Sequence, residues 1–187
     1  MSSKNPKIAL IILNWNGKKL LDISFPCLAR QTYENLEIWV VENGSTDGSK
    51  EYIKENYPQF QMIDLDHNYG FAEGNNLAYK KLSSDVDYIL TLNNDVQIKD
   101  SFVEDFVRVA ESHREYSAFA PKIVFYYDKD VIDSCGIVIG QDGGGMNRGF
   151  KEKDQGQYEK AEEVFGPCAG AALYKKSAID TIGFFDN

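Results

Sequence analysis

Tyr88-Ile89-Leu90-Thr91-Leu92-Asn93-Asn94-Asp95 is the stretch that decides the fold of this chain. Residues 88–92 are the aromatic, aliphatic and β-branched types that favour a buried strand. Two carboxamides and a carboxylate follow at once, and in open α/β sheets ligands bind beyond the carboxyl ends of the strands. Turn chemistry is the alternative, because Asn and Asp tolerate left-handed backbone geometry. The stretch alone does not choose between a ligand site and a turn.

Strand patterns alternate with helical patterns through the first part of the chain. The expected strands are 8–13, 36–41, 59–65, which should lie near an edge, and 88–92. The expected helices are 18–31, then one carrying Tyr52, Ile53 and Tyr57, one carrying Leu77, Ala78, Lys81 and Leu82, and one from Phe102 to Ala110. This alternation predicts right-handed βαβ units and an α/β fold with a mainly parallel, Rossmann-like sheet flanked by helices.

Local signals set several of the expected helix boundaries. Pro26 lies inside the first helical pattern and predicts a kink or two short helices. The second helix has three candidate caps within 45–47, and the helix at 102 has Asp100 or Ser101.

The alternation of strand and helix patterns ends after residue 116. Segments 117–125 and 132–139 have strand composition with no long helix between them. A polar stretch, 142–163, reads as a long functional or mobile loop. Segment 168–174 resembles a last buried strand, and 176–182 a short helix.

Composition limits the partners of this chain. Its 187 residues suit one domain, and its net charge of -9 argues against a nucleic-acid-binding surface. No apolar run is long enough for a transmembrane helix, and residues 1–7 do not form a signal peptide. The three cysteines are widely spaced and read as reduced thiols. A cytoplasmic location is the default expectation, with peripheral association at the inner face of the membrane left open.

Four polar segments follow four of the expected strands: 14–16, 42–45, 68–70 and 93–95. If these strands are parallel neighbours, the segments meet along one edge of the sheet and predict a ligand cleft. Asn and Glu side chains suit the polar edge of a base or the hydroxyls of a ribose. Asp95 is a hard oxygen ligand suited to magnesium or manganese on phosphate oxygens. No dinucleotide-type Gly-rich turn and no P-loop is present, which favours a metal-held diphosphate.

Each of these residues also has a purely structural interpretation. Residues 42–44 are compatible with a turn and a helix cap. Asn75 and Asn76 are compatible with a polar helix face. Trp15 and Phe71 are aromatic residues for which packing is favoured over base stacking.

The motifs resemble those of family 2 glycosyltransferases. Val40-Val41-Glu42-Asn43-Gly44-Ser45-Thr46-Asp47-Gly48-Ser49 is similar to the Val-Val-Asp-Asn-Gly-Ser-Thr-Asp-Gly-Ser signature of that family. Asn68-Tyr69-Gly70-Phe71-Ala72-Glu73-Gly74-Asn75-Asn76 resembles Asn-x-Gly-Phe-Ala-x-Gly-Asn-Asn of its rhamnosyltransferase-like branch. Leu92-Asn93-Asn94-Asp95 sits where the family carries Asp-x-Asp. Segment 166–174 resembles its acceptor-side segment, and 183–186 the Gly-Gly-Phe-Asp that follows.

The resemblance implies an A-type glycosyltransferase fold and inverting sugar transfer from a nucleotide-diphosphate-sugar to a glycan or lipid-linked acceptor. It also implies a divalent metal, magnesium or manganese, with Asp95 as its ligand. The branch favours deoxythymidine-diphosphate-rhamnose as the donor. Gly170 and Ala171 would line the acceptor side. The implied donor-binding residues are Asn14, Asn16, Glu42, Asn43, Ser45, Asn68, Gly70, Phe71, Asn75, Asn94 and Asp95.

The sequence departs from the family pattern in three places. Asn93 replaces the first acid of Asp-x-Asp, and Glu42 replaces the usual Asp. The family's Glu-Asp pair with the catalytic base would follow 183–186, but the sequence stops at Asn187. We therefore expect one incomplete domain, with a nucleotide-binding half at 1–115 and the start of an acceptor-side half at 116–187. Such a chain should bind nucleotide but transfer little sugar.

Two other functions remain open from the sequence. A nucleotidyltransferase has a similar sheet, but its first loop would be Gly-rich and basic, and 14–17 lacks that character. The second alternative is a non-catalytic nucleotide- or glycan-binding module. The absence of the Glu-Asp base motif from this sequence is compatible with such a module.

Overall fold

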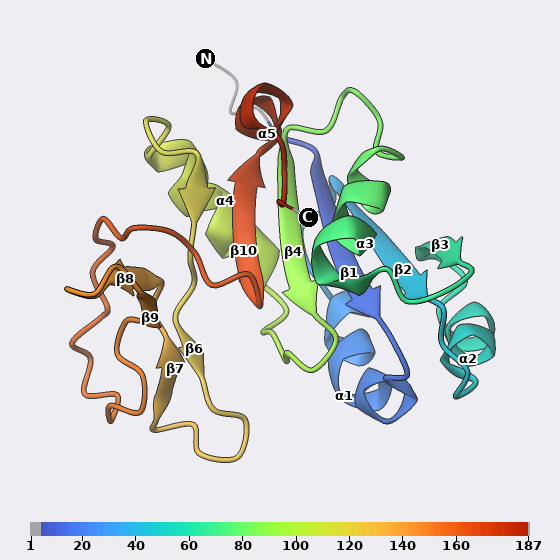
Figure 1. Ribbon diagram of the computed structural model, residues 1–187, viewed down its shortest axis with the longest axis horizontal. Coiled ribbons are helices and arrows are strands. Elements are labelled where there is room, and N and C mark those ends of the chain that lie inside the picture. Colours follow the sequence, from blue (N-terminus) through green and yellow to red (C-terminus); the bar gives the residue numbers. More distant parts are fainter. Residues whose placement is uncertain (1–4, 187) are drawn as a thin grey trace.

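The computed structural model describes residues 5–186, which form a six-stranded sheet with helices on both faces (Figure 1). The strand order is β3-β2-β1-β4-β10-β5. The strands are β1 (Ile8–Asn14), β2 (Leu36–Asn43), β3 (Gln61–Leu65), β4 (Tyr88–Asn93), β5 (Ala118–Phe119) and β10 (Ala171–Lys175). The first four strands are parallel, and β10 pairs antiparallel with both β4 and β5.

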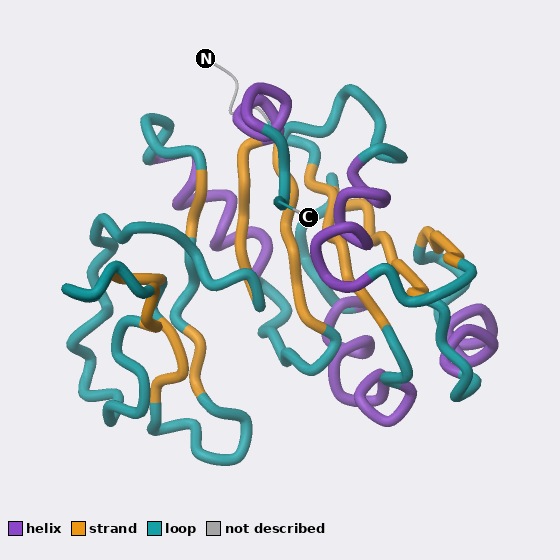
Figure 2. Tube along the Cα trace, viewed as in Figure 1, coloured by secondary structure: helices purple, strands orange, loops and turns teal. Residues whose placement is uncertain are grey.

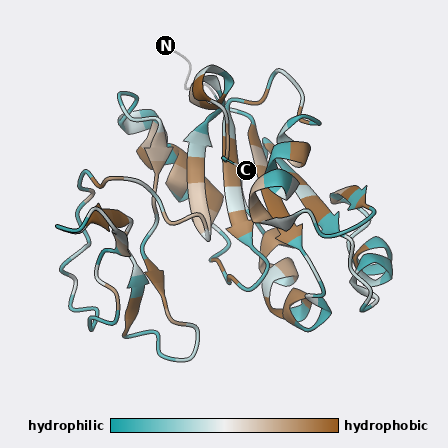
Figure 3. Ribbon diagram, in the orientation of Figure 1, coloured by the Kyte–Doolittle hydropathy of each residue, from teal (hydrophilic) through white to brown (hydrophobic). Residues whose placement is uncertain are grey.

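Within residues 5–186, five helices divide between the two faces of the sheet. They are α1 (Lys18–Ala29), α2 (Ser49–Asn56), α3 (Gly70–Tyr79), α4 (Phe102–Ser112) and α5 (Lys176–Ile182). Successive strand residues point to opposite faces. Leu10 therefore packs in the cluster that α1, α2 and α4 complete, whereas Ile11 packs in the cluster completed by α3 and α5. The central strands carry the strongest hydrophobic colouring (Figure 3).

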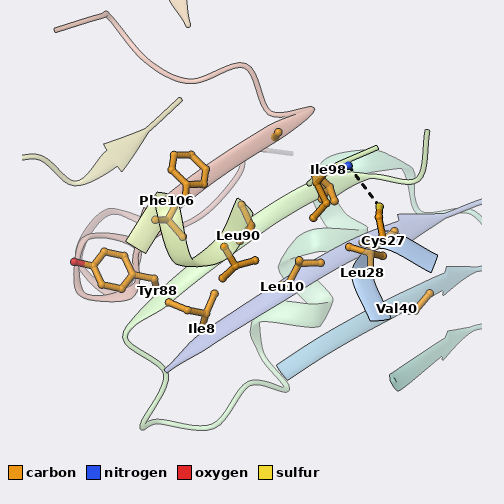
Figure 4. Packing of buried hydrophobic residues seen from close by; sticks show 14 of the residues in the cluster. Ile8, Leu10, Cys27, Leu28, Val40, Tyr88, Leu90, Ile98 and Phe106 are labelled. Carbon is orange, nitrogen blue, oxygen red and sulfur yellow. Dashed lines mark hydrogen bonds between the residues drawn. The ribbon is translucent and has the colours of Figure 1, made fainter. Parts of the chain in front are cut away.

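The core is built around β1, which has β2 on one side and β4 on the other. Residues 8–12 of this strand are fully buried. Ile8 and Leu10 lie beside Leu90 of β4, with Leu28 of α1 and Phe106 of α4 in the same cluster (Figure 4). A strand covered on both faces needs a continuous apolar run, and this strand has one.

The chain between β5 and β10 forms a lobe beside the main sheet (Figure 1). Strand β6 (Ile123–Val124) pairs antiparallel with β7 (Ile132–Ser134), and β8 (Ile137–Ile139) with β9 (Gly145–Asn147). Most of the rest of this lobe is loop (Figure 2). The predicted strands 117–125 and 132–139 are each divided in two, and the predicted loop 142–163 contains β9.

The parallel sheet, its first four strands and the edge position of β3 are confirmed. The first helix is continuous through Pro26 rather than two short helices. Its neighbours Phe25, Cys27 and Leu28 are buried, and this packing offsets the hydrogen bond that proline cannot make.

Two predicted helices need corrected boundaries, α2 and α3, whereas the predicted start of α4 at Phe102 is confirmed. Helix α3 begins at Gly70, several residues before the predicted anchors at Leu77 and Ala78, and it ends at Tyr79. Helix α2 begins at Ser49 because Gly48, with φ of 80°, occupies the N-cap position. Ser101 is the N-cap of α4, but its hydroxyl bonds to Asp105 and not to the helix backbone.

No helix in the described part of the chain is long and apolar enough to span a membrane.

Leu10→Ala should lower the free energy of unfolding by about 2–5 kcal/mol, because it leaves a cavity in the centre of the core. Urea denaturation monitored by circular dichroism measures this change. The control is Ile182→Ala at the end of α5, where the side chain is 84% exposed. We expect that control to stay within about 0.5 kcal/mol of the parent. Equal losses for the two variants would contradict the assignment of β1 as the core.

Candidate functional site

Two buried polar side chains end the neighbouring strands β1 and β2. Asn14 and Glu42 are partners in the strand register, so they point to the same face of the sheet. Their exposed fractions are 0% and 1%. Asn14 Nδ2 donates a hydrogen bond to Glu42 Oε2 at 3.0 Å. The carboxyl edge of the sheet therefore carries a polar pair inside the protein.

Both carboxylate oxygens of Glu42 are engaged by the segment that leads into α2. Ser49 Oγ donates to Glu42 Oε2 at 3.1 Å, and the Ser45 hydroxyl donates to Oε1. A buried carboxylate is tolerated when hydrogen bonds satisfy it, and this one accepts three. The sequence predicted Glu42 and Ser45, whereas the part played by Ser49 was not foreseen. Ser49 could have been singled out because it is the last residue of the motif 40–49, which also contains Glu42 and Ser45.

Asn94 joins this cluster from the end of β4. Its Nδ2 donates to Asn14 Oδ1 at 2.8 Å, so the Asn14 amide bonds at both ends. Gly17 lies against the pair. A Cβ at Gly17 would come within 2.2 Å of Asn94 Nδ2 and 2.4 Å of Asn14 Oδ1. Only glycine leaves room for this contact, and no sequence motif predicted it.

The turns after β1 and β2 bond to one another. The Asn16 backbone N–H donates to Ser45 Oγ at 2.9 Å, and Asn16 Oδ1 accepts from the Thr46 N–H at 2.8 Å. Asn16 has a φ of 50°, which asparagine tolerates better than most residues. The two predicted donor-binding residues, Asn16 and Ser45, are thus brought together.

Asp47 ties the start of α1 to the start of α2. Its carboxylate accepts from the backbone N–H of Lys18 at 2.8 Å and of Ser49 at 3.0 Å. Desolvation alone would raise the pKa of Asp47, but the hydrogen bonds from Ser49 and Lys18 outweigh it. The pKa of this carboxyl therefore lies below its ordinary value of 3.8. Of the three candidate caps of α2, Asp47 therefore accepts a hydrogen bond from the N–H of Ser49, the first residue of that helix.

A second hydrogen-bonded group lies on the opposite face of the sheet. Asn43 follows Glu42 in β2, so its side chain points toward α3. Its Nδ2 donates to Asn68 Oδ1 at 2.9 Å and to the Gly70 carbonyl at 3.3 Å, and its Oδ1 accepts from the Tyr69 N–H at 2.9 Å. The predicted residues Asn43, Asn68 and Gly70 therefore come together as the cap of α3.

The remaining donor-side predictions fall in different environments. Asn75 is buried on α3 and its Nδ2 donates to the Phe71 carbonyl at 2.8 Å. The Phe71 ring packs edge-on against Phe185, with 5.3 Å between centroids. Trp15, directly after β1, is 54% exposed and stacks on no ring among the described residues, so the choice between packing and base stacking stays a prediction.

The end of β4 faces the acceptor-side segment. Asn93 N–H donates to the Gly170 carbonyl at 2.9 Å, and Ala171 pairs with Leu92 in the strand register. Asp95 is exposed, and its carboxylate makes no hydrogen bond or ion pair with the described residues. No group of three or more His, Cys, Asp or Glu side chains gathers as a metal site within residues 5–186.

This donor set fits a divalent metal only together with a ligand. Magnesium is commonly held by one or two carboxylates plus phosphate oxygens and water. Asp95 supplies one carboxylate at the carboxyl edge, and Asn93 and Asn94 supply amide oxygens next to it. The residues therefore suit a metal bridging to a diphosphate rather than an all-protein metal site.

A groove of about 530 Å³ lies elsewhere, between α4 and residues 158–164. None of the predicted site residues lines it.

Comparisons with known proteins agree with this geometry. The model of "Glycosyl transferase family 2" matches residues 9–183. This chain belongs to that family. The membership favours sugar transfer over nucleotidyl transfer.

Two curated proteins are similar in sequence. An uncharacterized glycosyltransferase of Haemophilus influenzae is 27% identical over 139 residues, which is 73% of this chain and 41% of that protein. Glycosyltransferase GlyA of Streptococcus pneumoniae is 30% identical over 106 residues, which is 52% of this chain and 14% of GlyA. This chain therefore spans less than half the length of these relatives.

Two solved structures share the fold. Mannosyltransferase PcManGT from Pyrobaculum calidifontis, in complex with GDP-Man and Mn2+, has a TM-score of 0.67 and 16% identity, over 97% of this chain and 48% of that one. S. aureus TarS 1-349 has a TM-score of 0.67 and 17% identity, over 97% and 50%. The predicted A-type glycosyltransferase fold is confirmed.

Glu42→Ala should lower the free energy of unfolding by on the order of 3 kcal/mol, because the buried Asn14 amide and Ser49 hydroxyl lose their acceptor. Thermal and urea unfolding measure the loss. Glu51→Ala, on the exposed side of α2, is the matched control and should change stability by under about 0.5 kcal/mol. If the Glu42 variant is as stable as the Glu51 variant, the hydrogen bonds of Glu42 do not contribute to the free energy of unfolding.

Proposed function

We propose that the carboxyl edge of the sheet binds a nucleotide-diphosphate-sugar donor. The protein would transfer the sugar, with inversion, to a hydroxyl of a glycan or a lipid-linked acceptor. The observation that carries the proposal is the continuous hydrogen-bonded cluster at the ends of three adjacent strands, which runs from Asn94 through Asn14 to Glu42. Membership of glycosyl transferase family 2 supports the reaction class.

The buried members of the cluster act as a platform. Glu42 uses both carboxylate oxygens within the protein, and Asn14 uses both ends of its amide. The groups left for the nucleoside lie at the rim. Asn94 Oδ1 accepts no hydrogen bond from the described residues, and the indole of Trp15 presents a largely exposed flat face. A base stacked on Trp15 and hydrogen-bonded at Asn94 fits these free groups.

The diphosphate fits beside Asp95. A divalent metal held there would neutralise charge on the departing diphosphate. Asp95 would bind this metal through its exposed carboxylate, and Asn94 would keep the rim of the cluster in place through its bond to Asn14. PcManGT was solved with GDP-Man and Mn2+ and TarS with UDP-GlcNAc, which supports a nucleotide-sugar and a metal in this fold.

The acceptor would approach from the side of Gly170 and Ala171. The Gly170 carbonyl is bonded to the end of β4, so this segment lies beside the proposed diphosphate site. Residues 1–115 would then be the nucleotide-binding half and 116–187 part of the acceptor side. We assign the base that removes the acceptor proton to none of the described residues. A donor with a rhamnosyl group and a place at the inner face of the membrane stay predictions from the sequence.

Isothermal titration calorimetry with UDP, GDP and deoxythymidine diphosphate tests the donor site directly. We expect at least one diphosphate to bind with a dissociation constant of about 1 mM or tighter when Mn2+ is present, corresponding to about -4 kcal/mol. The affinity should fall when EDTA removes the metal. If no diphosphate binds with or without manganese, the donor site is wrong and a glycan-binding module becomes the better reading.

Asp95→Ala should weaken manganese-dependent diphosphate binding at least about tenfold, because it removes the only carboxylate proposed for the metal. Binding measured in EDTA should not change. Asp128→Ala is the matched control, since that acid is also exposed but lies in the turn between β6 and β7. Unchanged manganese dependence in the Asp95 variant would mean that another group holds the metal.

A further inference from the structure

Asn76 of α3 bonds to a backbone segment far along the chain. Its Nδ2 donates to the Phe185 carbonyl at 2.9 Å, and its Oδ1 accepts from the Phe185 N–H at 3.1 Å. One carboxamide thus satisfies both backbone groups of one residue, as a neighbouring strand would. The bond joins parts of the chain that are 109 residues apart.

Aromatic rings hold the same segment, which we define as the clamped segment, residues 183–186. Phe185 packs edge-on against Phe71 in the first turn of α3, with 5.3 Å between centroids. Phe184 lies 5.7 Å from Tyr79 at the last residue of α3 and 5.6 Å from Tyr174 of β10. The clamped segment therefore contacts both ends of α3 as well as β10.

The clamped segment runs back across the sheet toward the proposed cleft. The chain leaves α5 at the amino end of β4 and returns over the face that carries α3 (Figure 1). The first turn of α3 lies at the carboxyl edge, because Asn43 bonds to Asn68 and to the Tyr69 N–H. Contact with Phe71 therefore places Phe185 next to that edge.

The two sides of the proposed cleft are built by different elements. The nucleoside platform of Asn14 and Glu42 faces α1 and α2, whereas the clamped segment lies over α3 and β10 on the other face. A ligand that spans the edge would meet the platform with its nucleoside and the clamped segment with its far end. In a nucleotide-sugar the far end is the sugar.

We propose that Asn76 is a positioning residue that holds the clamped segment as the wall of the cleft on the sugar side. The inference rests on the proposed function, because it assigns the sugar end of the donor to this wall. Asn76 itself contacts the chain and not the donor. Its loss should release the clamped segment, weaken the contribution of the sugar to donor affinity and leave the nucleoside diphosphate bound as before.

The test compares two ligands in the same proteins. Calorimetry in Mn2+ measures the affinity for each diphosphate, UDP, GDP or deoxythymidine diphosphate, and for the matching sugar nucleotide, UDP-GlcNAc, GDP-mannose or deoxythymidine-diphosphate-rhamnose. For Asn76→Ala we expect the affinity for the sugar nucleotide to fall about tenfold and that for the diphosphate to stay within about twofold. Asn76→Asp should lose at least as much, because its carboxylate still accepts from the Phe185 N–H but sets a second oxygen, which cannot donate, against the Phe185 carbonyl.

Two further measurements separate positioning from general stability. Hydrogen exchange of the Phe185 amide should speed up in Asn76→Ala while the amides of β1 stay protected. Asn56→Ala is the matched control, since among the described residues the Asn56 carboxamide bonds only to the Tyr52 carbonyl of its own helix. It should change neither ligand affinity. If Asn76→Ala does not fold, Asn76→Asp alone still gives the comparison.

The outcomes are distinguishable. Equal weakening of both ligands, or no change in either, overturns the positioning of the sugar side while the donor site stands. A parent chain that binds no diphosphate overturns the proposed function and this inference together. Loss confined to the sugar nucleotide in Asn76→Ala and Asn76→Asp, with both affinities unchanged in Asn56→Ala, supports Asn76 as the positioning residue.

Discussion

The alternation of side chains at the ends of β1 and β2 is the constraint on which the site depends. Asn14 and Glu42 are register partners, so they share a face and bond to one another. Asn43 is the next residue, and the pleat turns it to the opposite face, where it caps α3. One strand end therefore organises both faces of the sheet. A shift of one residue in the register would exchange the two groups and leave polar side chains in the apolar layers.

The sequence was most informative where one local signal decided the structure. The apolar run at β1 is typical of a strand buried on both faces, and the mainly parallel sheet followed from βαβ alternation. The start of α3 was not predicted, although Asn68 accepts from the Gly70 N–H two residues on; Asn43, which accepts from the Tyr69 N–H, lies 26 residues earlier in the chain. Segments 117–125 and 132–139 were predicted as single strands, whereas each is divided in two, and the ladders β6–β7 and β8–β9 pair neighbouring segments of the chain.

The sequence predicted which residues lie at the site better than it predicted their hydrogen-bond partners. The motif pointed to Asn14, Glu42 and Asn94 as polar groups at strand ends, and the structure brings all three together. It did not show that Glu42 would be enclosed by hydroxyls from 45–49. Hydrogen-bond partners depend on distances of a few tenths of an ångström, and a residue pattern does not contain those distances.

Burial of the Glu42 carboxylate has a consequence for ligand recognition. A carboxylate that already accepts three hydrogen bonds in a dry site gains little from a fourth partner, whereas a wet rim group gains a bond without a large desolvation cost. The longer glutamate arm can reach Ser45 and Ser49 while its backbone stays in β2. Selectivity at this edge should therefore come from rim groups such as Trp15 and Asn94, and the buried cluster should supply the rigidity that fixes their positions.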